Sequence, residues 1–273
     1  MEFSLKFGKG NIQFNIDRKN ILDVLMPNKI NIDKAGEDEV IRALRNPISS
    51  PRLKDLVDRG DKVAIITSDI TRPMPSRIVL PPLLEELYKA GIKNEDITIV
   101  FALGSHRKHT EEEKKYIVGE KVYRKIKCID SDMNDCIHLG TTTSGTPVNI
   151  FRPVVEADKR ICLGNIEYHY FAGYSGGAKA IMPGVSTRDA IQANHSMMVD
   201  NKAKAGAIAD NPLRADIEEV TNFITIDFIL NVVLDENTEL YVAQLVGGRL
   251  PEGATTLPEG YSFKFYRVTI VQG

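Results

Sequence analysis

A chain of 273 residues with 42% hydrophobic and 26% charged side chains has the composition of a folded globular protein, and it is long enough for one large domain or two modest ones. Its 35 basic and 37 acidic residues are mixed along the chain and give a formal net charge of −2, which makes nucleic acid an unsuitable partner. Because no apolar run reaches membrane length and the first residues do not form a signal peptide, we expect a cytoplasmic protein that does not bind membranes.

The N-terminal residues predict a β-hairpin with one buried face. Residues 3–7 and 12–16 alternate apolar and polar side chains, and the Gly-Lys-Gly-Asn segment between them is typical of a turn. Further along the chain, Ser50 and Pro51 predict the N-cap and the first residue of a short helix that extends to Val57.

The middle of the chain predicts a βαβ unit. Two short apolar runs, 62–67 and 96–103, flank an amphipathic helix that we expect from about Ser76 to Ala90. Continuously apolar strands are typical of a parallel sheet that is covered on both faces. Further strands are expected at 159–164, 227–234 and 239–246. Together these elements predict an α/β fold, a Rossmann-like three-layer domain with a mostly parallel sheet, plus the N-terminal hairpin.

Polar segments follow three of the expected strands, at the edge where open α/β sheets bind their ligands. These segments are 68–75, 104–107 and 165–179. In the first, two prolines restrict the backbone around Arg72, whose guanidinium could bind a carboxylate through two hydrogen bonds. The alternative is that Arg72 pairs with Asp69 and only braces the loop.

Three histidines are candidates for chemistry. His106 directly follows the second strand of the βαβ unit, which suits a catalytic base, although a structural histidine is the alternative. His109 precedes Thr110, an expected helix N-cap, so we interpret His109 as a solvated neighbour and not as a metal ligand. His195 is expected on a helix that begins near Thr187, where a lone histidine is more often structural than metal-binding.

The segment around Ser175 fits two rival motifs. Gly173-Tyr-Ser-Gly-Gly177 satisfies the pattern G-x-S-x-G of serine hydrolases, although Ser175 lies well past the end of the nearest strand. The same glycines with Lys179 suggest a phosphate loop, but Lys179 is followed by alanine, where the Walker motif needs serine or threonine. A domain that binds a small molecule or nucleotide without catalysis is the non-enzymatic alternative. The three cysteines form no CxxC pair and indicate buried free thiols.

Several longer motifs occur together in one order along the chain. They are SDITRPMP (68–75), ALGSHRKH (102–109), NDCIHLGTTTSGTPVNIFRPVVEAD (134–158), YHYFAGYSGGAKAIMPG (168–184) and NHSMM (194–198). In this combination the chain resembles the lactate racemase family, the nickel-pincer-nucleotide enzymes, over roughly residues 1–242. The resemblance implies an isomerase that racemises a small 2-hydroxy acid, with lactate as the default substrate.

The resemblance also implies a cofactor and the residues that hold it. A pyridinium-derived nickel pincer nucleotide would be attached covalently to Lys179, after delivery by cofactor-synthesis proteins. His195 would complete the coordination of nickel, for which a neutral imidazole is a suitable ligand. Ser175, Gly176 and Gly177 would lie against the cofactor, since glycines leave room for a phosphate.

By the same resemblance, His106 and His169 would be the two acid/base residues. One histidine takes the hydroxyl proton while hydride moves to the cofactor, and the second serves the other face of the substrate. Arg72 would bind the substrate carboxylate, and Asp69 would support the loop that carries it.

The resemblance finally predicts the domain organisation. Residues 1–243 would form the cofactor-bearing N-terminal domain, whereas relatives carry a second, C-terminal lobe that closes over the site. Residues 244–273 do not match what should follow, so we expect an atypical tail and no C-terminal lobe. Because an open site admits water, we expect little or no turnover from this chain alone.

Overall fold

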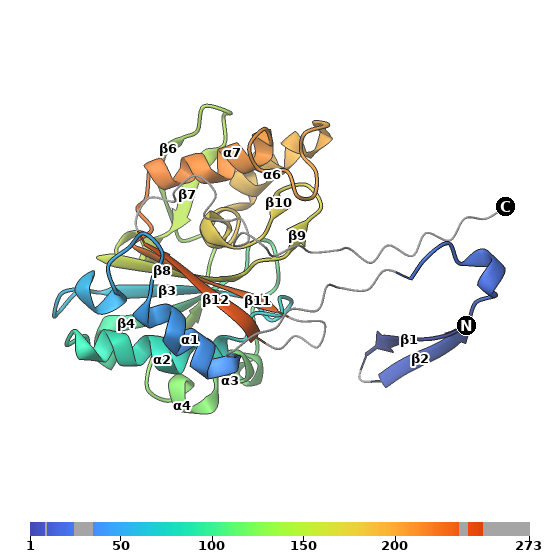
Figure 1. The fold of residues 1–273 in the computed structure, drawn as a ribbon. Helices are drawn as coiled ribbons and strands as arrows, with labels where there is room; N and C mark the ends of the chain where they lie inside the picture. Colours follow the sequence, from blue (N-terminus) through green and yellow to red (C-terminus); the bar gives the residue numbers. More distant parts are fainter. Residues whose placement is uncertain (9, 25–34, 235–239, 248–273) are drawn as a thin grey trace. The chain divides into compact units, whose positions relative to one another are not determined.

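The computed structural model describes residues 1–8, 10–24, 35–234 and 240–247. The chain divides into two compact units, of which one contains residues 1–24 and the other contains the described residues from 35 onward (Figure 1). None of the described helices is long and apolar enough to cross a membrane. All three thiols are free, as expected, but only Cys162 is fully buried.

The N-terminal unit is an antiparallel hairpin of β1 (Glu2–Phe7) and β2 (Gly10–Asn15), followed by a 3₁₀ turn at Arg18–Asn20. The rings of Phe3 and Phe14 stack across the hairpin with their centroids 5.7 Å apart. The hairpin itself is therefore confirmed, but its expected buried face is wrong. Three of its apolar side chains are exposed, namely Leu5, Phe7 and Ile12. Among the described residues of this unit, 1–8 and 10–24, no second layer covers that face.

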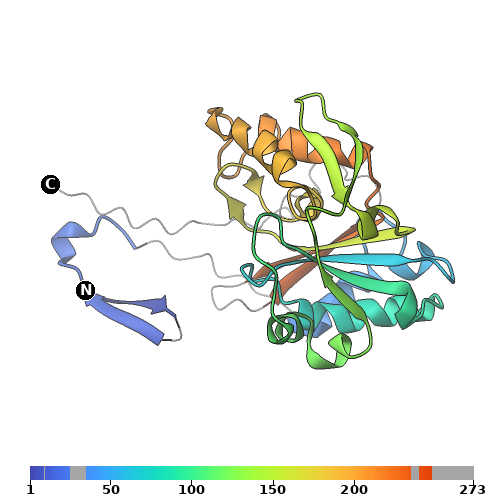
Figure 2. The same ribbon diagram turned by 180° about the vertical axis from the view of Figure 1, so that it is seen from behind.

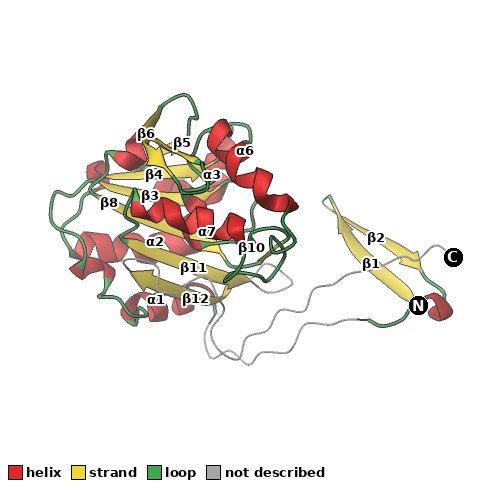
Figure 3. Ribbon diagram, turned by 90° about the horizontal axis from the view of Figure 1, so that it is seen from above, coloured by secondary structure: helices red, strands yellow, loops and turns green. Residues whose placement is uncertain are grey.

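A six-stranded sheet in the order β12-β11-β8-β3-β4-β5 forms the centre of the second unit (Figure 3). The strands are β3 (Val63–Ser68), β4 (Ile97–Ala102), β5 (Lys127–Asp130), β8 (Lys159–Asn165), β11 (Phe228–Leu234) and β12 (Leu240–Gly247). Only β12 at the edge runs antiparallel to its neighbour, which confirms the mostly parallel sheet. The chain leaves β3 toward β4 and later returns to β8 on its other side. A crevice at the carboxyl ends of β3 and β8 is the expected ligand position in such a sheet.

Helices cover both faces of the sheet and complete the three layers (Figures 1 and 2). One face packs against α1 (Gly36–Arg45), α2 (Ser76–Lys89), α3 (Glu111–Val118) and α4 (Glu120–Tyr123). The other face packs against α5 (Arg152–Val155), α6 (Arg188–Ser196), α7 (Pro212–Glu219) and the hairpin of β6 (Cys136–Thr141) and β7 (Pro147–Phe151). Short 3₁₀ turns lie at Leu53–Asp55, Asn94–Asp96, Gly177–Ala180, Met197–Val199 and Val220–Asn222. A two-stranded ribbon of β9 (Tyr168–His169) and β10 (Gly173–Tyr174) lies between β8 and α6 in the chain.

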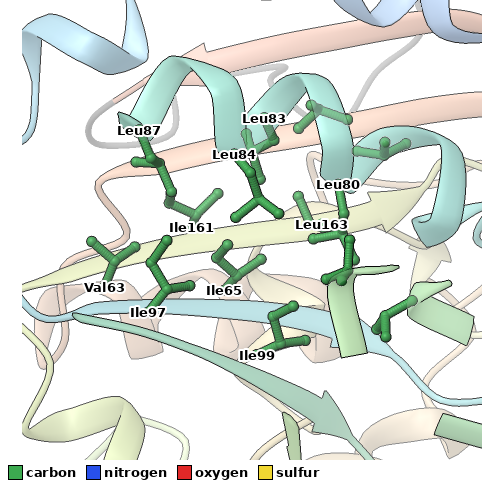
Figure 4. Packing of buried hydrophobic residues seen from close by; sticks show 14 of the residues in the cluster. Val63, Ile65, Leu80, Leu83, Leu84, Leu87, Ile97, Ile99, Ile161 and Leu163 are labelled. Carbon is green, nitrogen blue, oxygen red and sulfur yellow. The ribbon is translucent and has the colours of Figure 1, made fainter. Parts of the chain in front are cut away.

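The helix α2 shows why these elements form. Its apolar residues recur at helical spacing and point onto the sheet (Figure 4). They are Leu80, Leu83, Leu84 and Leu87, and they lie over isoleucines of β3, β4 and β8. The strand β3 is buried along almost its whole length, as expected for a parallel strand covered on both faces.

Other elements depart from the expectation. The short helix expected from Ser50 to Val57 is a single 3₁₀ turn at Leu53–Asp55, preceded by Arg52 at the N-cap position. The Ser50 hydroxyl does not cap it, because it donates to the carbonyl of Pro51. Strand β12 extends to Gly247, beyond the end of the predicted N-terminal domain at residue 243, and the predicted tail from 248 onward lies outside the described residues.

Candidate functional site

A cavity of about 170 Å³ lies at the carboxyl ends of β3, β4 and β8. It is lined by the loops that follow these strands, by the turn at Gly177–Ala180 and by α6. The predicted site residues that line it are Asp69, Arg72, His106, His169, Ser175, Gly176, Lys179 and His195. The predicted residue Gly177 does not line it. Gly177 is buried, and its N–H donates to Oδ1 of Asn231 at 3.2 Å.

The loop after β3 pairs a carboxylate with an imidazole. Asp69 is buried, and its Oδ1 accepts hydrogen bonds from the N–H and the hydroxyl of Thr71 at 3.1 and 2.7 Å. Its Oδ2 contacts Nδ1 of His106. A neutral His106 therefore carries its proton on Nδ1 and keeps Nε2 free to accept another. No ion pair joins Asp69 to Arg72 among the described residues, so the structural pair considered above is not formed.

His109 is buried, which corrects its interpretation as a solvated neighbour. Its Nδ1 lies 2.6 Å from Oδ1 of Asp130, and its Nε2 accepts a hydrogen bond from the N–H of Ile70 at 3.1 Å. Both ring nitrogens are thus used inside the protein, and the ring ties the loop after β3 to the end of β5. Thr110 caps α3 as expected, with its hydroxyl accepting from the N–H of Glu113.

The ribbon of β9 and β10 holds His169 at the cavity. Nδ1 of His169 accepts a hydrogen bond from the N–H of Ala172 at 3.2 Å, and the rings of His169 and Phe171 form a T-shaped pair with their centroids 4.4 Å apart. Burial, followed by the positive charge of Lys179, lowers the pKa of His169 to about 3. At neutral pH this ring is uncharged and carries its proton on Nε2.

This low pKa makes stability depend on pH. The unfolded chain takes up a proton at His169 below pH ~6.5, whereas the folded chain does so only near its lowered pKa of about 3. The contribution of His169 to the free energy of unfolding is therefore fully present above pH ~6.5. It falls as the pH falls, by at most about 1.4 kcal/mol per pH unit. Solvent screening of the half-exposed ring reduces this effect. We expect the wild type to lose roughly 1–2 kcal/mol more than His169→Asn between pH 7.5 and 4.5 in urea unfolding.

The asparagine in this comparison keeps an acceptor for the N–H of Ala172 but does not titrate. Losses that are common to both proteins, such as those from carboxylates, cancel in the difference. Unfolding free energies that fall in parallel for the two proteins would show that His169 is not held uncharged.

Lys179 enters the cavity from the turn at Gly177–Ala180. The preceding Gly176 has a φ of +84°, and a Cβ there would lie 2.9 Å from Oδ1 of Asn231, so only glycine fits at this position. Burial, followed by the charge of the Arg214 guanidinium, lowers the pKa of Lys179 to about 7. No side chain in the described part of the chain bonds to its amine. A large fraction of this amine is therefore uncharged and nucleophilic near neutral pH.

His195 lies on α6, which begins after the N-cap Thr187 as expected. Its Nδ1 is 3.1 Å from Oδ1 of Asn194, and its ring packs against Phe171 at 4.9 Å. Burial lowers the pKa of His195, and Lys179 adds to this effect. The described residues contain no group of three or more His, Cys, Asp or Glu side chains placed to hold a metal ion. A metal at His195 would therefore need donors from another source.

The hydroxyl of Ser175 is occupied by the backbone. It donates to the carbonyl of Asn165 at 2.6 Å and accepts from the N–H of Glu167 at 3.0 Å. None of the described histidines forms a hydrogen bond with it. The arrangement does not fit an activated serine nucleophile, which needs an adjacent base.

Residues 7–206 match the family model of the lactate racemase N-terminal domain. The chain belongs to the lactate racemase family. Over 243 residues, it is 37% identical to a lactate racemase of Thermoanaerobacterium thermosaccharolyticum and 34% identical to one of Lactiplantibacillus plantarum. Both matches cover 86% of this chain but 57% of the relative, so the chain spans little more than half the length of these relatives.

Solved structures agree with this assignment. The lactate racemase apoprotein from T. thermosaccharolyticum matches with a TM-score of 0.80 and 35% identity, over 90% of this chain and 59% of the other. A Thermotoga maritima protein matches with a TM-score of 0.65 and 22% identity, over 78% of this chain and 55% of the other, and shows a shared fold. The resemblance of the sequence motifs to the family is thus confirmed.

Two residues that influence Lys179 or the turn that carries it were not predicted from the sequence. The buried Arg214 on α7 donates to the carbonyl of Tyr174 at 2.9 Å, and Asn231 on β11 holds the glycine turn. Both come from elements that lie well after the recognised motifs in the chain. No local spacing marks them, so only the fold could reveal their position.

Proposed function

We propose that this chain is the cofactor-bearing half of an enzyme that racemises a small 2-hydroxy acid, with lactate as the default substrate. This proposal rests on one observation, that five side chains meet at one cavity. They are an arginine, a lysine of lowered pKa and three histidines. Those residues are Arg72, His106, His169, Lys179 and His195. Membership of the lactate racemase family supports it, although the relatives named lactate racemase are much longer.

The side chains fit the nickel pincer nucleotide that the resemblance implies. Lys179 offers a partly uncharged amine for covalent attachment, and His195 offers a ring nitrogen to the metal. The described residues supply no further metal-binding cluster, which agrees with a cofactor that brings its own donors to nickel. When bound, the cofactor would supply a reversible acceptor for the hydride of the substrate carbon.

The remaining residues would bind the substrate and move its proton. Arg72 has no ion-pair partner in the described part of the chain and would bind the carboxylate. His106, oriented by Asp69 through Nδ1, would accept the hydroxyl proton at Nε2. His169 would present its protonated Nε2 to the hydroxyl oxygen of the substrate from the opposite face. In this arrangement Asp69 acts through His106 and not as a direct substrate contact.

Mass spectrometry of the chain produced together with the cofactor-synthesis proteins tests the proposal. We expect a covalent adduct on the peptide that contains Lys179 and a nickel content near one per chain. Lys179→Arg should carry neither, whereas Lys202→Arg, a change at an exposed lysine, should load normally.

Other outcomes separate the alternatives. A wild-type chain without adduct and nickel would contradict the proposal and favour a domain that only binds a small molecule. Labelling of Ser175 by an active-site serine probe would favour a hydrolase instead.

A further inference from the structure

We propose that Asp216 and Asn194 are positioning residues that hold His195 in the tautomer whose Nε2 is unprotonated and able to bind a metal ion. The inference rests on the proposed function, because it concerns the same histidine. The tautomer itself can be measured in the cofactor-free protein, however. Two buried polar groups, Asp216 and Asn194, are linked by hydrogen bonds to the partly buried His195.

The first group is the carboxylate of Asp216 on α7, which is fully buried. It accepts hydrogen bonds from the hydroxyls of Thr142 at 2.5 Å and Thr146 at 2.8 Å, both in the turn between β6 and β7. The Thr142 oxygen also accepts from the N–H of Thr146 at 3.0 Å, so its own proton is directed to Asp216. A carboxylate is an acceptor only, so each group that contacts it must donate.

The second group is the side-chain amide of Asn194 on α6, which is also fully buried. One end of this amide lies 2.8 Å from Oδ2 of Asp216 and 3.1 Å from the carbonyl of Leu213. Both neighbours are acceptors, so the NH₂ group must point toward them. A flipped amide would place its oxygen against two other oxygens and leave buried donors unpaired. The oxygen of Asn194 is therefore fixed on the side of His195.

The third group is His195 itself. Its Nδ1 lies 3.1 Å from Oδ1 of Asn194, an acceptor, so Nδ1 must donate. The uncharged ring then has its proton on Nδ1 and a lone pair on Nε2. A histidine free in water favours the opposite tautomer, so this preference has to come from the protein. Hydrogen bonds of this kind set the orientation and tautomer of metal-binding histidines in general.

Nitrogen NMR of the uniformly ¹⁵N-labelled full chain measures the tautomer directly. Long-range ¹H–¹⁵N correlations, assigned with His195→Gln, should show a protonated Nδ1 and an unprotonated Nε2 for His195 in the wild type. In Asn194→Ala, which removes the acceptor, the ring should shift toward the Nε2–H tautomer. Asp216→Asn, of nearly equal shape, should produce a mixture of tautomers because it no longer dictates the orientation of the amide.

Matched controls separate positioning from general loss of structure. Glu219→Gln changes a neighbouring carboxylate of α7. Glu219 binds the same turn through Thr143 but does not contact Asn194, so this variant should leave the tautomer of His195 unchanged. The buried His109, held by Asp130, should keep its own Nδ1–H pattern in every folded variant.

Two results would overturn the inference. One is a wild-type His195 with its proton on Nε2, which requires no variant to observe. The other is a folded Asn194→Ala in which His195 remains protonated on Nδ1. If the tautomer responds as expected while the co-produced protein carries no nickel, the proposed function fails and the positioning of His195 by Asn194 and Asp216 stands.

Discussion

Lys179 is expected to be the fastest of the lysines to react with an acylating reagent near pH 7.5. Only the uncharged amine is a nucleophile, and burial lowers the pKa of Lys179 to about 7. An ordinary lysine, with a pKa of about 10.4, is uncharged in roughly one molecule per thousand at this pH. The uncharged fraction of Lys179 is therefore larger by a factor on the order of several hundred. Its lower basicity and restricted access reduce the rate advantage but leave the midpoint of its pH profile unchanged.

Limiting acetylation followed by peptide mass spectrometry measures this effect. The rate at Lys179 should rise with pH to a plateau with a midpoint near 7, whereas the rate at the exposed Lys202 should still be rising at pH ~9. Unfolding in urea should abolish the difference, because both burial and the nearby guanidinium of Arg214 are lost. Profiles of the same shape for the two lysines in the folded protein would show that Lys179 is an ordinary ammonium group.

This property bears on covalent attachment of a cofactor. A lysine that stayed charged at neutral pH would first have to lose a proton before its amine could form a bond to carbon. The turn at Gly177–Ala180 instead delivers an amine that is already partly uncharged into the cavity. The arginine that lies behind this turn contributes to the effect, and it comes from α7, outside the recognised motifs.

Much of the fold and the site follows from local sequence. Parallel strands such as β3 and β4 are buried on both faces, so their apolar runs stand out from the surrounding chain. The residues after such strands then meet at one edge of the sheet, which is why Asp69, His106 and Lys179 could be placed in one site. Helix α6 was also predictable, because Thr187 caps it.

The edge strand β5 could not be predicted in the same way. Strand β5 is short and only partly buried, so it lacks a continuous apolar run. Without β5 there was no reason to place Asp130 beside His109, and the histidine was misinterpreted as solvated. The links from Asp216 to Asn194 and from Asn231 to Gly177 likewise join residues far apart in the chain. Such contacts depend on tertiary packing and leave no spacing signal.

Gly173→Ala is expected to lower the free energy of unfolding by about 3 kcal/mol or more. Gly173 has a φ of +76°, and a Cβ at this position would lie 2.0 Å from the carbonyl oxygen of Ala207. The unfavourable φ alone costs an alanine about 1–2 kcal/mol. The overlap adds to it, because a backbone carbonyl cannot rotate away as a flexible side chain would. That carbonyl also accepts a hydrogen bond from the buried Asn211, which moving it would break.

Gly145→Ala is the matched control, because Gly145 has a φ of +87° but a Cβ at this position would have no atom within 4 Å. Gly145→Ala should lower the free energy of unfolding only through its unfavourable φ. The difference between the two variants in urea unfolding therefore isolates the effect of the close approach at Gly173. Equal losses would mean that the segment around Ala207 moves aside at little cost. In the native register Gly173 lies opposite His169, so the same clash should displace the imidazole from the cavity and change its NMR chemical shifts. A stability loss without such a change would show that the ribbon of β9 and β10 holds His169 independently of the segment packed against Gly173.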